Sequence, residues 1–154
     1  MSEIQRINEQ LRQAFEGNAW HGPAVRELLA DVTAARAAAR PLPSAHSIWE
    51  IVLHIATWEC VVRRRLQGET IADLPPEQDW PAIQDTSEAA WRKAIQDLER
   101  ANHALREEIA RVDEKGLAGT VPGKEHSVYT MLHGIIQHDL YHAGQVALLK
   151  KALS

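Results

Sequence analysis

Residues 127–153 of the chain are SVYTMLHGIIQHDLYHAGQVALLKKAL, a stretch that we expect to form one long helix. One face of this helix carries His138 and His142, which lie four residues apart and therefore about one helical turn from each other. Two imidazoles at this spacing are close enough to hold one ion. Firm metal sites usually take at least three protein ligands, so another segment must supply a third.

Apolar residues occur nearly all round the same helix. A helix of this kind is buried on two sides, so we expect the face opposite His138 to pack against residues 24–39 or against another subunit. That opposite face consists of Tyr129, Leu132, Ile136, Leu140, Ala143 and Ala147.

Three further segments show helical periodicity and are expected to form amphipathic helices, namely 3–16, 48–67 and 87–112. Residues 24–39 are expected to form a shorter, interrupted helical stretch after the first helix. The proline-rich and acidic segment 68–85 has no clear period and is expected to be a loop or a partly ordered excursion.

Ser47 and Glu50 have the spacing of a capping box, in which the serine accepts from an early backbone N–H and the glutamate reaches back to the cap. Neither a strand-like alternation nor an internal repeat is present. The prediction is an all-α protein, a four-helix bundle with a short additional helical segment after the first helix, with residues 1–154 forming a single domain.

The composition excludes several classes of function. The net charge is −4, and the longest basic cluster is Arg63–Arg65 near a predicted helix end, which argues against nucleic-acid binding. No apolar run could span a membrane, and the first residues lack the order of a secretion signal, so we expect a cytoplasmic protein without a membrane partner. Cys60 is the only cysteine, which excludes an internal disulfide and a thiolate zinc cluster within one chain.

His54 is the candidate third ligand, because it lies on the apolar face of the segment 48–67. Helical bundles build metal sites from side chains that project inward from facing helices. Three imidazoles resemble the ligands of catalytic zinc, with a position left for water or substrate. Hydrogen-bonded core histidines without a metal are the alternative, although burying three basic rings without a metal or acidic partners would be costly.

Other side chains are candidates for supporting roles. Glu50 is a helix cap, a hydrogen-bond acceptor that orients a metal-binding histidine, or a general base. His21 is a surface residue or a proton shuttle beside Trp20. Three residues near the candidate ligands are expected to contact substrate or to orient a ligand, namely Trp58, Tyr141 and Gln145, with a packing role alone as the alternative for Tyr141. The remaining histidines are expected on the surface or near helix caps: His46, His103, His126 and His133.

Two long phrases resemble the DinB superfamily, also called the YfiT-like family of metalloenzymes: HSIWEIVLHIATWE at 46–59 and GIIQHDLYHAGQVALLKK at 134–151. FEGNAWHGP at 15–23 and DWPAIQDTSEAAW at 79–91 are also similar to phrases of that family. The resemblance implies a four-helix bundle, often homodimeric, in which His54, His138 and His142 bind a divalent metal ion. Zinc or nickel is expected first, with iron and manganese as alternatives.

The resemblance implies less about the reaction. Some members of the family are transferases of low-molecular-weight thiols, such as bacillithiol or mycothiol, and others are described as hydrolases of small molecules. A charged thiol cosubstrate would need a cationic group near the site, for which Arg65 is a distant candidate. The alternative is a non-catalytic metal-binding or stress-related bundle, although structural zinc sites usually have four protein ligands.

Overall fold

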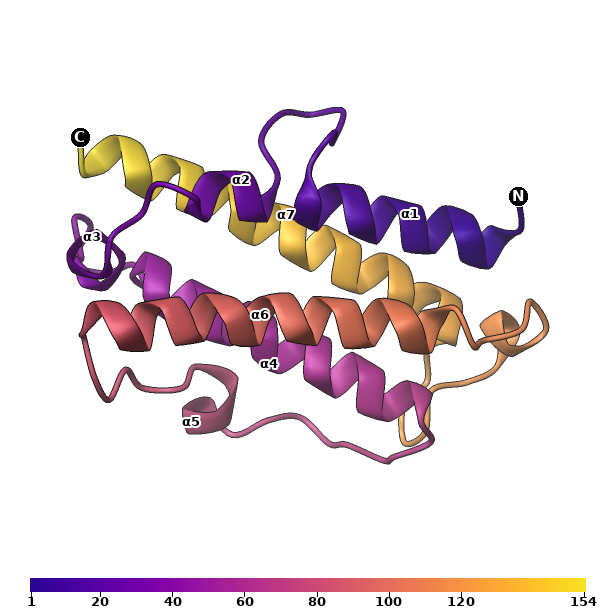
Figure 1. The fold of residues 1–154 in the computed structure, drawn as a ribbon. Helices are drawn as coiled ribbons and strands as arrows, with labels where there is room; N and C mark the ends of the chain where they lie inside the picture. Colours follow the sequence, from indigo (N-terminus) through magenta and orange to yellow (C-terminus); the bar gives the residue numbers. More distant parts are fainter.

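The structure, a computed structural model, describes residues 1–154 and is entirely helical apart from its connections. Four long helices lie alongside one another (Figure 1), which confirms the predicted all-α bundle. In chain order the elements are α1 (Glu3–Glu16), α2 (Val25–Leu29), α3 (Ala34–Ala38), α4 (Ile48–Leu66), α5 (Pro76–Asp79), α6 (Glu88–Ile109), the 3₁₀ turn η1 (Gly116–Ala118) and α7 (Val128–Ala152).

Serine begins each of the long helices. The hydroxyl groups of Ser2, Ser47, Ser87 and Ser127 each accept a hydrogen bond from the backbone N–H three residues later. Each such cap typically stabilises a helix by about 1 kcal/mol. The Glu50 carboxylate in turn accepts a hydrogen bond from the backbone N–H of Ser47, so the predicted capping box is present.

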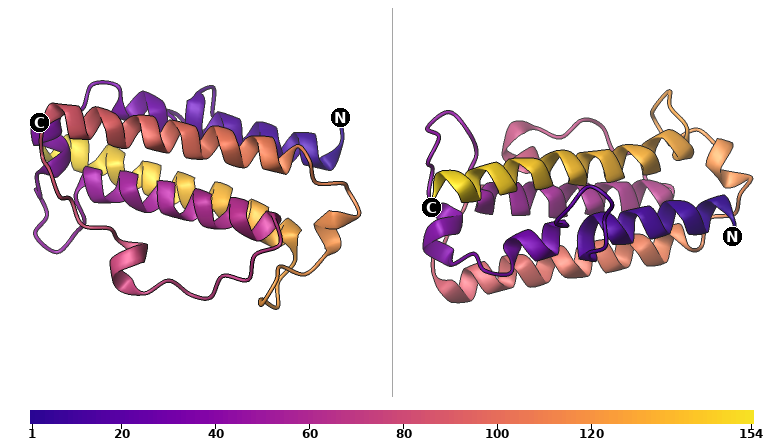
Figure 2. Two further views of the ribbon diagram at one scale, coloured as in Figure 1. Left: turned by 60° about the horizontal axis from the view of Figure 1, so that its bottom comes forward. Right: turned by 90° about the horizontal axis from the view of Figure 1, so that it is seen from above.

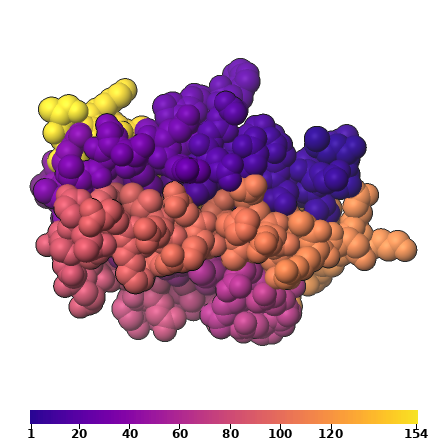
Figure 3. All heavy atoms as spheres, in the orientation of Figure 1, coloured from indigo at the N-terminus to yellow at the C-terminus, as the bar shows by residue number.

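The predicted segment after the first helix consists of two short helices, α2 and α3. The turn between α1 and α2 projects from the body of the molecule (Figure 3). Helix α2 then continues the line of α1 (Figure 1). The side chain of Trp20 in this turn is fully exposed.

Helix α7 is buried on two sides, as predicted. One side packs against α4. The other is covered by α2, which lies in the predicted segment 24–39, and also by α1, for which no contact with α7 was predicted. Leu132 and Ile136 join a core cluster with residues of α1, whereas Ala143 joins a second cluster with residues of α2. The chain itself therefore covers most of this face. The prediction was wrong for Tyr129, which stands near the start of α7 with 44% of its surface exposed.

Residues 67–87 run along the outer side of α4 (Figure 2) and contain the short helix α5, which contacts α4. This connection brings Asp79 and Trp80 beside the middle of α4. None of the helices combines the length and the apolarity needed to cross a bilayer.

Candidate metal centre

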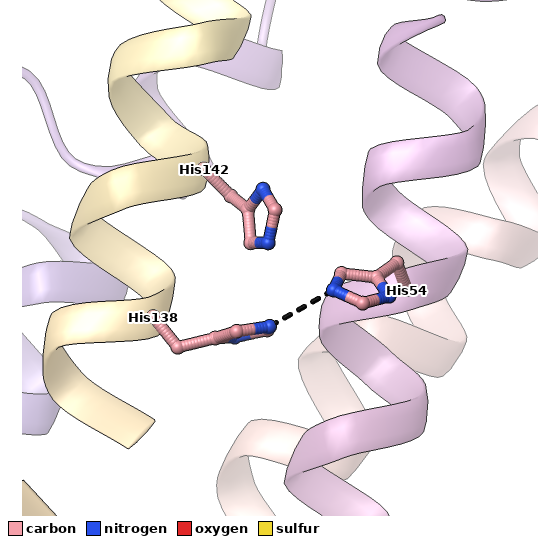
Figure 4. A group of neighbouring side chains, drawn as sticks. All are labelled: His54, His138 and His142. Atoms are coloured by element: carbon pink, nitrogen blue, oxygen red, sulfur yellow. Dashed lines mark hydrogen bonds between the residues drawn. The ribbon is translucent and has the colours of Figure 1, made fainter. Parts of the chain in front are cut away.

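Three imidazole rings meet between α4 and α7. His138 and His142 project from α7 toward His54 of α4 (Figure 4), and one candidate ligand atom from each ring lies within 4.8 Å of the others. His54 and His142 are buried, and His138 is partly exposed. The structure thus brings together the three histidines that the sequence singled out.

The Nδ1 atom of each ring has an oxygen neighbour. His54 Nδ1 lies 2.7 Å from the backbone oxygen of Asp79, and His142 Nδ1 lies 2.7 Å from Oε1 of Gln145. His138 Nδ1 has a longer contact of 3.4 Å to the carboxylate of Asp139. A ring that donates through Nδ1–H keeps the lone pair of Nε2 free, which is the arrangement that metal-binding histidines usually show.

The rings of His54 and His138 approach each other closely, with 3.0 Å between their Nε2 atoms. Because His54 donates from Nδ1, its Nε2 offers a lone pair, and the contact is favourable only with a proton or a metal ion between the two nitrogens. Two nitrogen ligands of one tetrahedral zinc ion are ~3.3 Å apart. The donor set therefore fits a divalent ion.

The surroundings keep the three rings neutral. Burial lowers the pKa of His138 to about 4 and that of His142 to about 4, and it also lowers the pKa of His54. A neutral imidazole has a lone pair to give to a metal, whereas a protonated ring has none. At pH 7 the site is thus ready to accept a cation without first releasing protons.

The connection between α4 and α6 supports His54 from the side away from α7. Asp79 Oδ1 accepts a 2.7 Å hydrogen bond from Trp58 Nε1 and lies 3.3 Å from His54 Nδ1. Trp80 stacks on the His54 ring at 3.8 Å between centroids, and His46 stacks on the other face of Trp80 at 3.6 Å. Sequence reasoning missed both Asp79 and Trp80, and it expected His46 only on the surface or near a cap.

A cavity of about 440 Å³ opens beside His142. Its walls are mostly apolar, with Trp80, Tyr141 and Leu148 among them, and its polar groups include His46 and Gln145. No acidic or basic side chain other than histidine lines it. The cavity suits an organic molecule without a strongly charged group at this end.

Only some of the predicted supporting residues lie next to the three histidine rings. Trp58, Tyr141 and Gln145 all lie near the rings, with Tyr141 edge-on to His142 at 5.2 Å. Glu50 accepts from the backbone of Ser47, pairs with Arg40 and lies 3.7 Å from His46, so its carboxylate is engaged outside the cluster.

His21 lies apart from the three rings. It is exposed in the turn between α1 and α2, where it lines a different cavity with Gln13, Ile136 and Leu140. The structure shows no contact between His21 and the cluster, so a shuttle at this position would have to act from a distance.

Two carboxyl groups are fully buried next to the histidines. Glu59 of α4 accepts from Asn102 Nδ2 at 2.8 Å, and Asp139 follows His138 on α7. Glu59 Oε2 and Asp139 Oδ2 are buried without a hydrogen-bond partner. Burial and the nearby Asp139 carboxylate raise the pKa of Glu59, and burial raises that of Asp139. We therefore expect the two carboxyl groups to share one proton.

Glu59→Gln is expected to stabilise the protein at pH 8. The raised pKa of Glu59 means that its favourable contribution is present at low pH and is lost as the pH rises through the folded-state value. Glutamine keeps an oxygen for Asn102 and offers N–H to Asp139, so a gain of about 1–3 kcal/mol is expected at pH 8, with a smaller gain at pH 5. Urea denaturation at the two values of pH measures this difference, and a loss of stability at pH 8 would contradict the shared proton.

Gln145→Leu is expected to weaken metal binding about 10- to 100-fold, as loss of a ligand's hydrogen-bond partner typically does. The leucine side chain fills similar space but leaves His142 Nδ1 without its acceptor. Competition with a chromophoric chelator measures the affinity. Gln137→Leu, at an exposed position of the same helix, is the matched control, and equal affinities of the two variants would contradict the orienting role of Gln145.

Comparison of the sequence with known families gives a match. The model of the DinB superfamily matches residues 19–146, a range that includes all three histidines and the connection with Asp79 and Trp80. No curated protein matches the chain, and no solved structure does either.

Proposed function

Because the chain belongs to the DinB superfamily, we propose that it is a divalent-metal-dependent enzyme that transfers a low-molecular-weight thiol to a small organic substrate. The observation that carries the proposal is the set of three neutral imidazoles, with their Nδ1 atoms engaged and their ligand atoms around one point. We infer that His54, His138 and His142 hold the ion, which is zinc or nickel first, with iron or manganese as alternatives.

A divalent ion bound there would supply a Lewis-acidic position at which a thiol or a water molecule loses its proton. The side chains around the ion would orient its ligands and bind the substrate. Asp79 and Gln145 orient two of the rings, and Trp80 shields one face of His54 from water. The apolar walls around Tyr141 and Leu148 would bind the organic part of the substrate beside His142.

Hydrolysis of a small molecule is the second candidate, and one observation favours it. His46 lines the cavity, and its Nδ1 lies 3.7 Å from Glu50 Oε1. A histidine next to a carboxylate is a common general base, which would suit removal of a proton from water. In this version Glu50 acts through His46 rather than directly.

A screen of thiols against electrophiles separates the two reactions. The metal-loaded protein is incubated with glutathione, bacillithiol or mycothiol and an electrophile, and the loss of free thiol is followed with and without a chelator. We expect chelator-sensitive consumption of a thiol. No thiol consumption, together with cleavage of esters or amides, would favour hydrolysis. Absence of both reactions in a protein that binds metal would favour the non-catalytic metal-binding bundle.

A further inference from the structure

A second cavity, of about 240 Å³, opens on the other side of the histidine cluster, next to His138. Val62 of α4 and Met131 and Ile135 of α7 form apolar walls. Trp58 and His138 also line it, so it adjoins the candidate metal centre. Arg65 supplies its only charged side chain.

The guanidinium group of Arg65 is buried but not paired with an acid. Arg65 is only 6% exposed, and no carboxylate lies within ion-pair distance of it. Its Nη2 donates to the backbone oxygen of Ile71 at 2.9 Å, and its Cζ lies 5.8 Å from the centre of the Trp58 ring. The Nε atom is buried without any partner.

The nearest acidic residue does not relieve this charge. Asp73 is almost fully exposed and pairs with Lys124 at 2.7 Å. Burial accordingly lowers the pKa of Arg65, with Asp73 as a weaker opposing influence. An arginine side chain nevertheless stays protonated in proteins, and a buried charge without a counter-ion is costly. The cavity thus holds a permanent positive charge with unused donor capacity.

The chemistry of the cavity selects the kind of anion. A guanidinium group matches a carboxylate with two parallel hydrogen bonds. A single cation balances one negative charge, whereas a phosphate dianion would normally need more donors than this site offers. The walls formed by Val62, Met131 and Ile135 favour an aliphatic or aromatic body over a polar one.

We propose that the cavity beside Arg65 binds the carboxylate of a small organic acid with an apolar body, as a substrate subsite that adjoins His138. This proposal rests on the proposed function, because a molecule whose carboxylate binds Arg65 would extend toward His138, one of the three proposed metal ligands. It assigns the reactant that binds beside His138, as distinct from the one that binds beside His142, to the class of small monocarboxylates.

Gly134 offers a way to block this cavity without touching Arg65. It lies on the cavity wall in α7, and a Cβ atom added there meets nothing within 4 Å. Gly134→Leu therefore directs an apolar side chain into free space, and replacing a glycine inside a helix should not lower helix stability. Gly144 in the same helix is exposed and equally open, so Gly144→Leu is the matched control.

The test is an NMR titration of the purified protein with butyrate, observed at the Nε–H signal of Arg65, which Arg65→Met identifies by its disappearance. Butyramide, which has the same shape and no charge, is the reference ligand. We expect saturable binding of butyrate at least 10-fold tighter than that of butyramide. Binding should weaken at least 10-fold in Gly134→Leu and stay within twofold of wild type in Gly144→Leu.

The titration is repeated after EDTA treatment, with the metal content measured in both samples. Binding that persists without metal and is lost in Gly134→Leu supports the subsite, whatever the metal content proves to be. Equal affinity for butyrate and butyramide, or unaltered binding in Gly134→Leu, overturns it. Binding that disappears with EDTA also overturns it, because the carboxylate would then sit on the ion. If the protein binds metal but no butyrate, only the subsite beside Arg65 is wrong. If it binds butyrate but no metal, the proposed metal-dependent function is wrong.

Discussion

His138→Ala is expected to weaken metal binding by more than ~100-fold, since loss of a supporting partner alone typically costs 10- to 100-fold. The variant removes one of the three imidazoles and leaves His54 and His142, which is too few ligands for firm binding. Thiol transfer or hydrolysis should fall to the background rate. Metal content after dialysis, followed by chelator competition, measures the first effect, and the assay of thiol loss measures the second.

His103→Ala is the control for this variant. His103 lies on α6 with most of its side chain exposed and only a contact to Glu107 within the same helix. It should retain the metal affinity and the activity of the wild type. If His138→Ala bound metal as tightly as His103→Ala, the three-histidine centre would be wrong.

Leu132→Ala is expected to reduce the free energy of unfolding by about 2–5 kcal/mol, the usual cost of removing a fully buried leucine side chain. Leu132 is completely buried in the core cluster that α7 forms with α1. For a chain of this size, that loss lowers Tm by roughly 5–15 °C. Thermal unfolding followed by circular dichroism measures the shift.

Leu148→Ala is the matched control on the same helix. Leu148 is 60% exposed, so its replacement should change the free energy of unfolding by no more than ~0.5 kcal/mol. If the two variants lost similar free energy of unfolding, the face of α7 toward α1 would stabilise the protein no more than the exposed face does, which would contradict the prediction.

The helices and the three histidines could be predicted because their signals are local or periodic. The pair Ser47 and Glu50 marks the start of α4 through a fixed spacing, and the capping box is present. His138 and His142 share a helix face through their spacing of four, and His54 follows the apolar face of α4. These patterns depend on helix geometry alone, which tertiary contacts did not alter here.

Asp79 and Trp80 could not be predicted as supports of His54. They lie in a connection without any periodicity, and no local rule places such a segment against a particular turn of α4. Their positions depend on how residues 67–87 fold back along the helix, which brings Asp79 within hydrogen-bond distance of both His54 and Trp58. The same connection places Trp80 against His46, so that His46, which was expected on the surface or near a cap, stacks on the Trp80 ring.

The sequence also carries a signal for the two buried acids. Glu59 interrupts the apolar series Val52, Ile55, Val62 and Leu66, and Asp139 interrupts the series Leu132, Ile136, Ala143 and Val146. Asn102 likewise falls within the apolar stripe of α6, between Leu98 and Leu105. A polar residue in an apolar stripe is a candidate for a buried, hydrogen-bonded group, and each of these three residues is buried.

The metal content of the wild-type protein, purified without a histidine tag, tests the central claim most directly. Elemental analysis, followed by titration of the chelator-treated protein with Zn²⁺, Ni²⁺, Fe²⁺ and Mn²⁺, should give one ion per chain, bound saturably by His54, His138 and His142. A protein that is isolated free of metal and takes up none of the four ions would contradict the account.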